Sequence, residues 1–222
     1  MDGAASADHF EMVKWLSDHR SEGCSTMTMD WAAHHGHLGV VQWLHENRKE
    51  GCTTEAMDSA AENGHLDIVK WLHENRSEGC TTAAMDGAAS YGHLGVVKWL
   101  HEHRDEGCTT RAMGNAAESG YLNVVKWLHL NRSDGCSNQV MRNAILHGHF
   151  DVLFFLHLQR EEDFVLYDYE NPHVPPELQQ WLLTHYTIQV NNWQFEEQKI
   201  HLDALRRITE YNYDYNNKCS WW

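Results

Sequence analysis

The chain has 222 residues, 42% of them hydrophobic, and a formal net charge of −15 with histidine neutral. That content can bury a substantial core, which excludes an intrinsically disordered chain. The acidic balance argues against binding to nucleic acid or anionic lipid, because both depend on Lys and Arg neutralising phosphates. The apolar runs fall short of the ~20 residues that cross a bilayer, and the chain does not open on a basic and then hydrophobic segment. If Met1 is the true start, we expect a non-secreted protein of the cytoplasm or nucleus.

The first residues already belong to a repeat. Met1–Ser6 is identical to residues 85–90 and in register with it, so the chain is predicted to begin inside a helix without a polar cap. Two explanations stay open. Either the chain is a fragment of a longer array, which we favour, or its N-terminal end is covered by a partner or another copy.

Residues 55–76 show the repeat unit. Apolar residues at helical spacing precede Gly64 and follow it, and this predicts a helical hairpin that reverses at a glycine with positive φ. Neither helix is long enough to be stable alone, so neighbouring units must hold it. The period is 28, and three residue types mark it: Trp15, Trp43, Trp71, Trp99 and Trp127; Met29, Met57, Met85, Met113 and Met141; Gly36, Gly64, Gly92, Gly120 and Gly148. Such self-similarity predicts an all-α solenoid over residues 1–160, with its first unit truncated.

Polar residues recur at the predicted helix ends. Threonine is a good N-cap, and a carboxylate near a helix N-terminus or a cation near its C-terminus complements the dipole. We predict that the threonines cap the first helix of each hairpin and that the arginines pair with carboxylates from repeat to repeat. These residues are Thr54, Thr82 and Thr110; Asp30, Asp58 and Asp86; Arg20, Arg48, Arg76, Arg104, Arg132 and Arg160; Glu22, Glu50, Glu78, Glu106 and Asp134.

Five of the six cysteines also lie one repeat apart: Cys24, Cys52, Cys80, Cys108 and Cys136. Equivalent positions in stacked helical units are roughly 10 Å apart, and a disulfide needs Cα atoms within about 7 Å. The ladder therefore predicts reduced thiols in equivalent small apolar sites, as in a cytosolic protein.

Residues 161–222 depart from the period. The pattern over 163–187 resembles a divergent hairpin, with Pro175-Pro176 before a predicted helix start. Residues 195–211 predict a closing helix with a polar outer face, as terminal units of a solenoid require. The aromatic segment 211–222 either folds back on that cap or contacts a partner.

The unit resembles a known repeat. Residues 60–72, Ala-Ala-Glu-Asn-Gly-His-Leu-Asp-Ile-Val-Lys-Trp-Leu, are similar to the core of the ankyrin repeat, and the match recurs from about residue 25 to 160. The resemblance is closest to shortened Trp-Leu-rich arrays of oomycetes, amoebae and giant viruses. Two departures stand out: the usual T-P-L-H start is replaced by Glu55-Ala-Met-Asp58, and the period is 28 instead of 33. The shorter period predicts short turns in place of the family's projecting β-hairpins. What the resemblance implies is protein binding without catalysis.

Four positions of the first helix differ from unit to unit while the apolar positions stay nearly constant. They share one helical face, which we call the variable face. Its residues are Met27, Trp31, His34 and His35; Glu55, Ser59, Glu62 and Asn63; Ala83, Gly87, Ser90 and Tyr91; Arg111, Asn115, Glu118 and Ser119; Gln139, Asn143, Leu146 and His147. The alternative to a binding surface is a solvated face under no constraint. Trp31, Met27 and Tyr91 favour binding, because exposed aromatic and large apolar side chains are typical of interfaces.

A metal site is the competing hypothesis, because His34, His35 and His37 cluster in the sequence. Most histidines recur with the repeat, however, and no Cys-x-x-Cys or His-Glu-x-x-His spacing appears. Phosphate loops, nucleophile elbows and carboxylate pairs unique to one unit are missing too. We predict no cofactor, metal site or catalytic residues.

We therefore expect a scaffold that binds a partner protein of unknown identity through the variable face, with no nucleic-acid or membrane partner. The alternatives are a structural or regulatory segment of a larger protein whose activity lies outside this chain, and a metal-dependent enzyme or metal store. A further expected contact is another chain, or missing repeats, at the uncapped N-terminal end.

Overall fold

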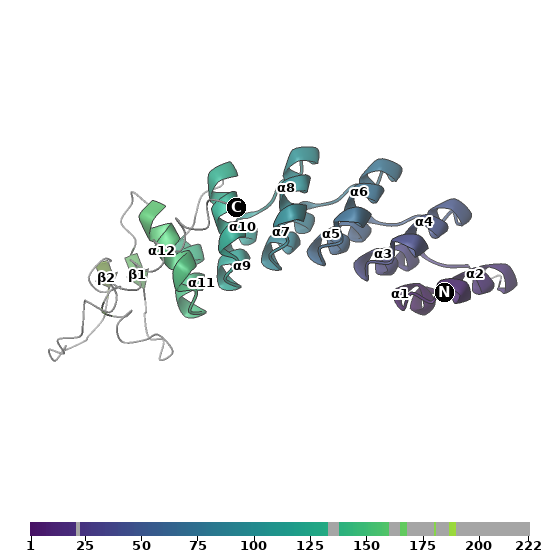
Figure 1. Ribbon diagram of the computed structural model, residues 1–222, viewed down its shortest axis with the longest axis horizontal. Coiled ribbons are helices and arrows are strands. Elements are labelled where there is room, and N and C mark those ends of the chain that lie inside the picture. The colour runs from purple at the N-terminus through teal and green to yellow at the C-terminus, as the bar shows by residue number, and fades with distance from the viewer. Residues whose placement is uncertain (21–22, 133–137, 160–164, 168–179, 181–186, 190–222) are drawn as a thin grey trace, which may run out of the picture. The chain divides into compact units, whose positions relative to one another are not determined.

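The computed structural model describes residues 1–20, 23–132, 138–159, 165–167, 180 and 187–189. The chain divides into two compact units, Met1–Val152 and Leu153–Trp222. In the first unit, helix pairs follow one another in sequence order (Figure 1). The helices are α1 Asp2–Ser6, α2 Phe10–His19, α3 Thr26–His34, α4 Leu38–Asn47, α5 Thr54–Glu62, α6 Leu66–Asn75, α7 Thr82–Ser90, α8 Leu94–His103, α9 Thr110–Glu118, α10 Leu122–Asn131, α11 Asn138–Leu146 and α12 Phe150–Gln159, which crosses the boundary between the units.

The pair α5 and α6 shows how the sequence period becomes a hairpin. Gly64 lies between the two helices with φ +80°, a left-handed conformation that glycine adopts without strain. Of the apolar residues predicted to hold the hairpin, all but one are at most 2% exposed: Ala56, Met57, Ala60 and Ala61 on α5, and Ile68, Val69 and Leu72 on α6. The exception is Leu66 at the start of α6, which is half-buried. Burying one side chain such as Leu72 contributes about 1.5–3 kcal/mol. The predicted helical hairpin is confirmed.

The first helices of the pairs stack directly on one another. Contacts join α1 to α3, α3 to α5, α5 to α7, α7 to α9 and α9 to α11, and the first helices α1, α3, α5, α7 and α9 also pack on their own second helices. Alanine supplies much of the buried surface of the first helices, for example Ala88 and Ala89 on α7. Because alanine is small, it allows neighbouring helices to approach closely. The all-helical solenoid predicted for the repeats is confirmed.

The connection from one pair to the next is a short turn. Between α4 and α5 the chain leaves the helix at Arg48 in an extended conformation, turns at Gly51 with φ +76°, and enters α5 after Thr53. Residues 48–53 contain no strand. This confirms the expectation of short turns where longer repeats of this kind project a β-hairpin.

The threonine that caps each first helix is one residue earlier than the sequence suggested. The N-cap of α5 is Thr53, whose hydroxyl oxygen accepts a hydrogen bond from the Glu55 N–H, and Thr54 is already helical. Thr81 and Thr109 take the same place before α7 and α9, so the prediction of Thr82 and Thr110 is wrong as well. An N-cap needs the extended backbone that precedes the helix, and this backbone belongs to the first threonine of each pair.

The repeated aspartates hold that cap from the preceding unit. Asp58 on α5 accepts hydrogen bonds from the N–H and the hydroxyl of Thr81, both at 2.8 Å. Asp30 accepts the same two bonds from Thr53, and Asp86 accepts them from Thr109. Burial raises the pKa of Asp58 and of Asp30, although the threonine hydrogen bonds oppose the shift. Each aspartate thus links two units through the start of the second unit's helix.

The arginine pairs lie within a unit, which corrects the repeat-to-repeat prediction. Arg48 Nη2 is 2.6 Å from Glu50 Oε1, and Arg76 pairs in the same way with Glu78. The arginine that ends a second helix and the acid two residues later face each other across one turn. The ion pair as a whole still contacts the preceding unit, because the Cys24 N–H donates to Glu50 Oε1 at 3.4 Å.

The cysteine ladder lies beside these ion pairs. Cys24, Cys52 and Cys80 are free thiols, and Cys52 and Cys80 are buried. Burial raises the pKa of Cys52 to about 12 and that of Cys80 to about 11. The sites are not purely apolar as predicted, since the nearby Arg76 guanidinium lowers the pKa of Cys52 against the effect of burial.

Rings from each unit cover the unit before it. A Cβ added to Gly64 would lie 2.6 Å from His93 Nδ1, and one added to Gly36 would lie 2.6 Å from His65 Cε1. Among the second helices, Trp71 meets His45 edge to face, with ring centroids 5.2 Å apart. The recurring glycines, histidines and tryptophans are therefore packing partners across the stacking interface.

The second unit contains a short parallel strand pair, β1 Val165–Tyr167 with β2 Thr187–Gln189. The helical hairpin predicted over 163–187 is therefore wrong at the residues that form these strands. The remainder of that segment, apart from Gln180, lies outside the described residues. So do the closing helix predicted over 195–211 and the aromatic segment 211–222, and the predicted boundary after residue 160 stays a prediction.

Candidate protein-interaction surface

The variable face occupies one side of the first helices α3, α5, α7, α9 and α11. All of its residues are exposed or half-buried, including Ser59 and Glu62 on α5, whereas Ala60 and Ala61 between them are fully buried. A helix with 3.6 residues per turn produces this division, because positions four, seven and eight residues on return to the same side. Repeat by repeat, the fold therefore presents these positions to solvent.

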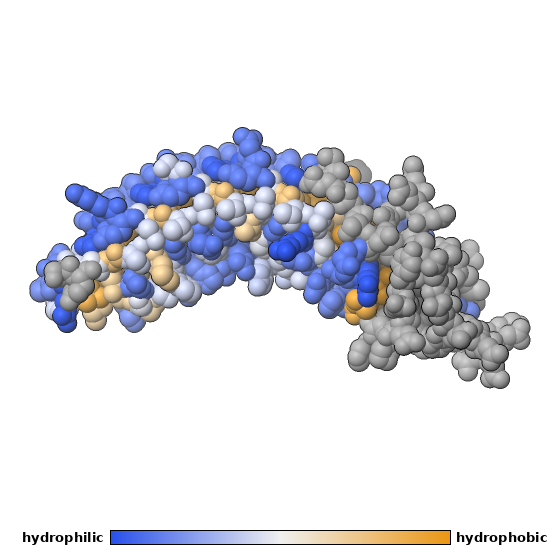
Figure 2. All heavy atoms as spheres, turned by 180° about the vertical axis from the view of Figure 1, so that it is seen from behind, coloured by the Kyte–Doolittle hydropathy of each residue, from blue (hydrophilic) through white to orange (hydrophobic). Residues whose placement is uncertain are grey.

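Large apolar side chains interrupt an otherwise polar surface. In the space-filling view most of the coloured surface is hydrophilic, and orange atoms appear in limited patches (Figure 2). On the variable face Met27 is 53% exposed, Trp31 is 42% exposed and Tyr91 is 56% exposed. Leu146 on α11 is 40% exposed as well. The three residues that the sequence singled out are thus among the apolar side chains that the fold leaves in contact with water.

Trp31 lies within a group of rings at the N-terminal part of the face. Its ring centroid is 5.5 Å from that of His34 and 5.8 Å from that of His35. His35 Nδ1 is 2.8 Å from the Trp31 carbonyl oxygen, and His34 Nδ1 is 3.2 Å from Asn63 Nδ2 on α5. Burial, with nearby His35 as a second cause, lowers the pKa of His34. These contacts orient the histidine rings around Trp31. They do not bring the ring nitrogens together at one point, as ligands of a metal ion would be.

Neighbouring units touch through the variable face itself. The side chain at the third position of one unit lies beside the second position of the next. Ser90 on α7 accepts a hydrogen bond from Asn115 Nδ2 at 2.9 Å, and Glu118 on α9 accepts one from Asn143 Nδ2 at 3.4 Å. The residues of this surface are consequently coupled in pairs.

Gly87 forms a gap in the middle of the face. At its position the other units carry Trp31, Ser59, Asn115 and Asn143. A Cβ at Gly87 would lie 2.9 Å from Glu62 Cβ, so the aliphatic part of Glu62 fills the space that a side chain on α7 would take. Tyr91 follows one turn later. The absence of a side chain at Gly87 therefore positions Glu62 against the same helix that carries Tyr91.

Among the residues that the structure describes, no three His, Cys, Asp or Glu side chains lie together as possible ligands of a metal ion. His37 Nε2 is engaged separately, 3.0 Å from the Ser6 carbonyl oxygen. No helix of the described residues is long and apolar enough to cross a bilayer.

Sequence comparison identifies the family to which this scaffold belongs. A model of ankyrin repeats in many copies matches residues 1–45 and 29–73, and a model of three ankyrin repeats matches residues 57–139. The chain belongs to the ankyrin repeat family. Ankyrin repeats are in general protein–protein interaction modules and typically have no enzymatic activity. No curated protein matches the chain.

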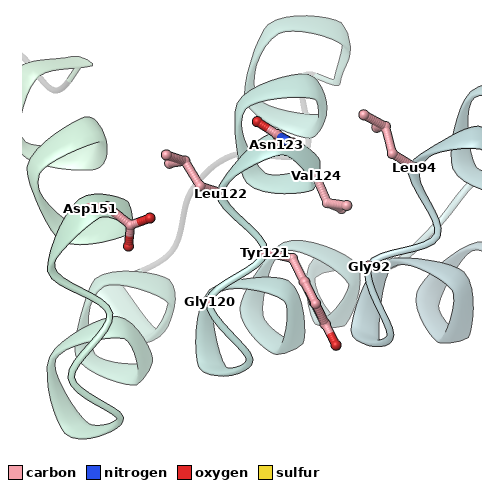
Figure 3. A pocket seen from close by; sticks show the side chains of 8 residues that line it. All are labelled: Gly92, Leu94, Gly120, Tyr121, Leu122, Asn123, Val124 and Asp151. Carbon is pink, nitrogen blue, oxygen red and sulfur yellow. The ribbon is translucent and has the colours of Figure 1, made fainter. Parts of the chain in front are cut away.

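The ankyrin array also has an open depression. It measures about 400 Å³ and lies at the turn before α8, the turn before α10 and the first turn of α12. Its lining is Gly92, Leu94, Gly120, Tyr121, Leu122, Asn123, Val124 and Asp151 (Figure 3). Tyr121 extends from the turn before α10 along the turn at Gly92, and its ring would be 2.6 Å from a Cβ there. None of the predicted site residues lines this depression.

Two exposed apolar residues, Tyr121 and Leu130, were not predicted as contact residues from the sequence. Tyr121 is 38% exposed and replaces the histidine found at this turn position in other units, such as His93. Leu130 on α10 is 75% exposed and stands where α4, α6 and α8 carry glutamate, such as Glu74. Both differ from most of their repeat counterparts, so a comparison of units beyond the first helix would have found them.

Proposed function

We propose that this ankyrin array binds a partner protein through the variable face, with Trp31, Met27 and Tyr91 as the principal contact residues. One observation supports this most: large apolar side chains that the core does not need remain 42–56% exposed on the side where the units differ most. Burying such side chains against a partner is favourable, and a few of them dominate the affinity of typical interfaces.

The free thiols indicate the cellular compartment in which this interaction takes place. Cys52 and Cys80 are buried, unpaired cysteines, and such thiols persist in reducing compartments. We place the interaction in the cytoplasm or nucleus on that ground.

Site-specific photo-crosslinking tests the surface. A photoreactive phenylalanine analogue replaces Trp31 or Tyr91, and a matched control replaces Leu130, which is 75% exposed on the second helix α10. We expect crosslinked partner at the two first-helix positions. The double change Trp31→Ala and Tyr91→Ala should abolish co-purification of that partner, since each truncation at a dominant contact costs about 2 kcal/mol or more. Retention of the partner by the double variant, with crosslinks only at Leu130, would show that another surface is used.

A second candidate contact is the N-terminal end of the array. Trp15 is 49% exposed and Met12 is 50% exposed, whereas Trp71 is half-buried beneath His45 of the unit before it. A further repeat-like unit, from the same chain or another, would cover Trp15 in the same way. Sedimentation of the wild type and of Trp15→Glu tests self-association through this end, because only the wild type should form larger assemblies as the concentration rises. Equal sedimentation of both proteins at all concentrations removes the second copy from consideration.

A further inference from the structure

We propose that the partner presents an extended basic segment to the variable face, with one cationic side chain seated on each side of Tyr91. This inference rests on the proposed function and narrows it to the chemistry of the partner. It follows from where the carboxylates of the face lie relative to its central aromatic ring.

Tyr91 lies between two glutamates that occupy equivalent positions. Glu62 on α5 and Glu118 on α9 share the third position of the variable face, and α7, which Tyr91 follows, packs between those two helices. Glu62 is held against α7 at Gly87, and Tyr91 is 56% exposed. A cation beside this ring can contact its face and a carboxylate together, an arrangement that favours Lys or Arg.

The other charged groups around the two glutamates leave the region acidic. Arg111 is the only Lys or Arg on the variable face, and it lies two helical turns before Glu118 on α9. Glu118 faces Asn143, and His147 Nε2 lies 3.6 Å from its Oε1, where a charge exists only when the histidine is protonated. On the other side, Glu62 faces His34, whose pKa is lowered.

Three arginines in the turns between units already have carboxylate partners of their own. The turn arginines Arg48, Arg76 and Arg104 are paired with Glu50, Glu78 and Glu106 within their own turns. The net charge of −15 gives the whole chain the same sign as the face. Charge complementarity therefore favours a basic segment over an acidic or uncharged one.

The helix spacing sets the spacing of the cations. Packed helices lie about 8–10 Å apart, so the two glutamates, two helices apart, are separated by roughly 16–20 Å. An extended chain rises about 3.3 Å per residue. A segment crossing α5, α7 and α9 would place its two basic side chains about five or six residues apart, with the intervening residues over Tyr91.

Selection from a random dodecapeptide library displayed on phage, with the whole purified chain as bait, tests this chemistry. We expect enriched peptides with two Lys or Arg residues five or six positions apart. A fluorescein-labelled synthetic copy of one such peptide is then titrated by fluorescence anisotropy. Glu62→Gln, Glu118→Gln and Tyr91→Ala should each weaken its binding about twofold to fivefold. Glu74→Gln on α6 changes the net charge equally and should leave binding unchanged. Circular dichroism confirms that every variant is folded.

Three results overturn the inference: no enriched peptide, enriched peptides without basic residues, or equal weakening by Glu74→Gln. Crosslinks at Trp31 and Tyr91 separate this failure from failure of the proposed function. If those crosslinks persist, the surface binds a partner of different chemistry. If they are absent as well, both proposals are wrong.

Discussion

Replacing Gly64 by alanine tests the packing between units most directly. The added Cβ meets two obstacles: a backbone φ of +80°, and the His93 ring at 2.6 Å. The left-handed conformation costs a residue with a Cβ about 1–2 kcal/mol. Displacing a packed ring adds about 1–3 kcal/mol. We expect Gly64→Ala to lower the free energy of unfolding by about 2–5 kcal/mol.

Gly148 provides the matched control. It has φ +75°, but among the residues that the structure describes the nearest atom to its added Cβ is Phe150 Cζ at 4.0 Å, an ordinary contact. Gly148→Ala therefore carries the backbone cost alone, about 1–2 kcal/mol. Both substitutions reduce the entropy of the unfolded chain similarly, so that effect cancels in the comparison.

Urea unfolding followed by circular dichroism and by tryptophan fluorescence measures the difference. Coincident transitions from the two probes establish that the array unfolds in one step, which a solenoid does not guarantee. In a His93→Ala background the cost of Gly64→Ala should fall to the Gly148→Ala value. If Gly64→Ala costs no more than Gly148→Ala, or if His93→Ala changes nothing, the ring does not restrict the glycine and this reasoning fails.

Three further predictions concern the turns. Measured by urea titration, Thr81→Ala should lower the free energy of unfolding by about 1–2 kcal/mol and Thr82→Ala by less than about 0.5 kcal/mol. A larger loss for Thr82→Ala than for Thr81→Ala would show that the second threonine is the cap. The hydrogen bond from Arg48 holds the pKa of Glu50 at about 2, below the ordinary 4.5. The ion pair therefore stabilises the fold fully above about pH 4.5, and this stabilisation is lost as the pH falls to about 2. The stability difference between wild type and Glu50→Gln should shrink over that range, and a constant difference would contradict the assignment. Because burial raises the pKa of Cys52 to about 12, alkylation at pH 8 followed by mass spectrometry should modify half-buried Cys24 well before Cys52 in the folded protein, and equal rates would argue against this burial.

The helices could be predicted because the residues that form them recur with a fixed period. Gly64, with Met57 before it and Leu72 after it, recurs every 28 residues, and a feature present in every unit must serve the stacking. The same periodicity separated the buried positions from the variable face, whose residues the fold leaves exposed or half-buried.

Details that depend on two units at once were harder to predict. Thr53 and Thr54 both look like caps in sequence, and the choice depends on Asp30 of the previous unit, which binds the first one. Similarly, sequence spacing cannot show that Arg76 turns back to Glu78 instead of reaching an acid in the next repeat. The strand Val165–Tyr167 had no repeat counterpart from which to infer it. Whether the variable face binds a partner stays a prediction, because exposure permits binding without requiring it.

The rings that cover the glycines give the ankyrin array a polarity. His65 covers Gly36 and His93 covers Gly64, so the side of each unit that faces the N-terminus carries projecting rings and the opposite side carries the bare backbone that receives them. The two sides are complementary to each other, but neither side is complementary to a copy of itself. Insertion or deletion of a whole 28-residue unit keeps every such pair intact, so the array can change in length by whole units without disturbing its stacking.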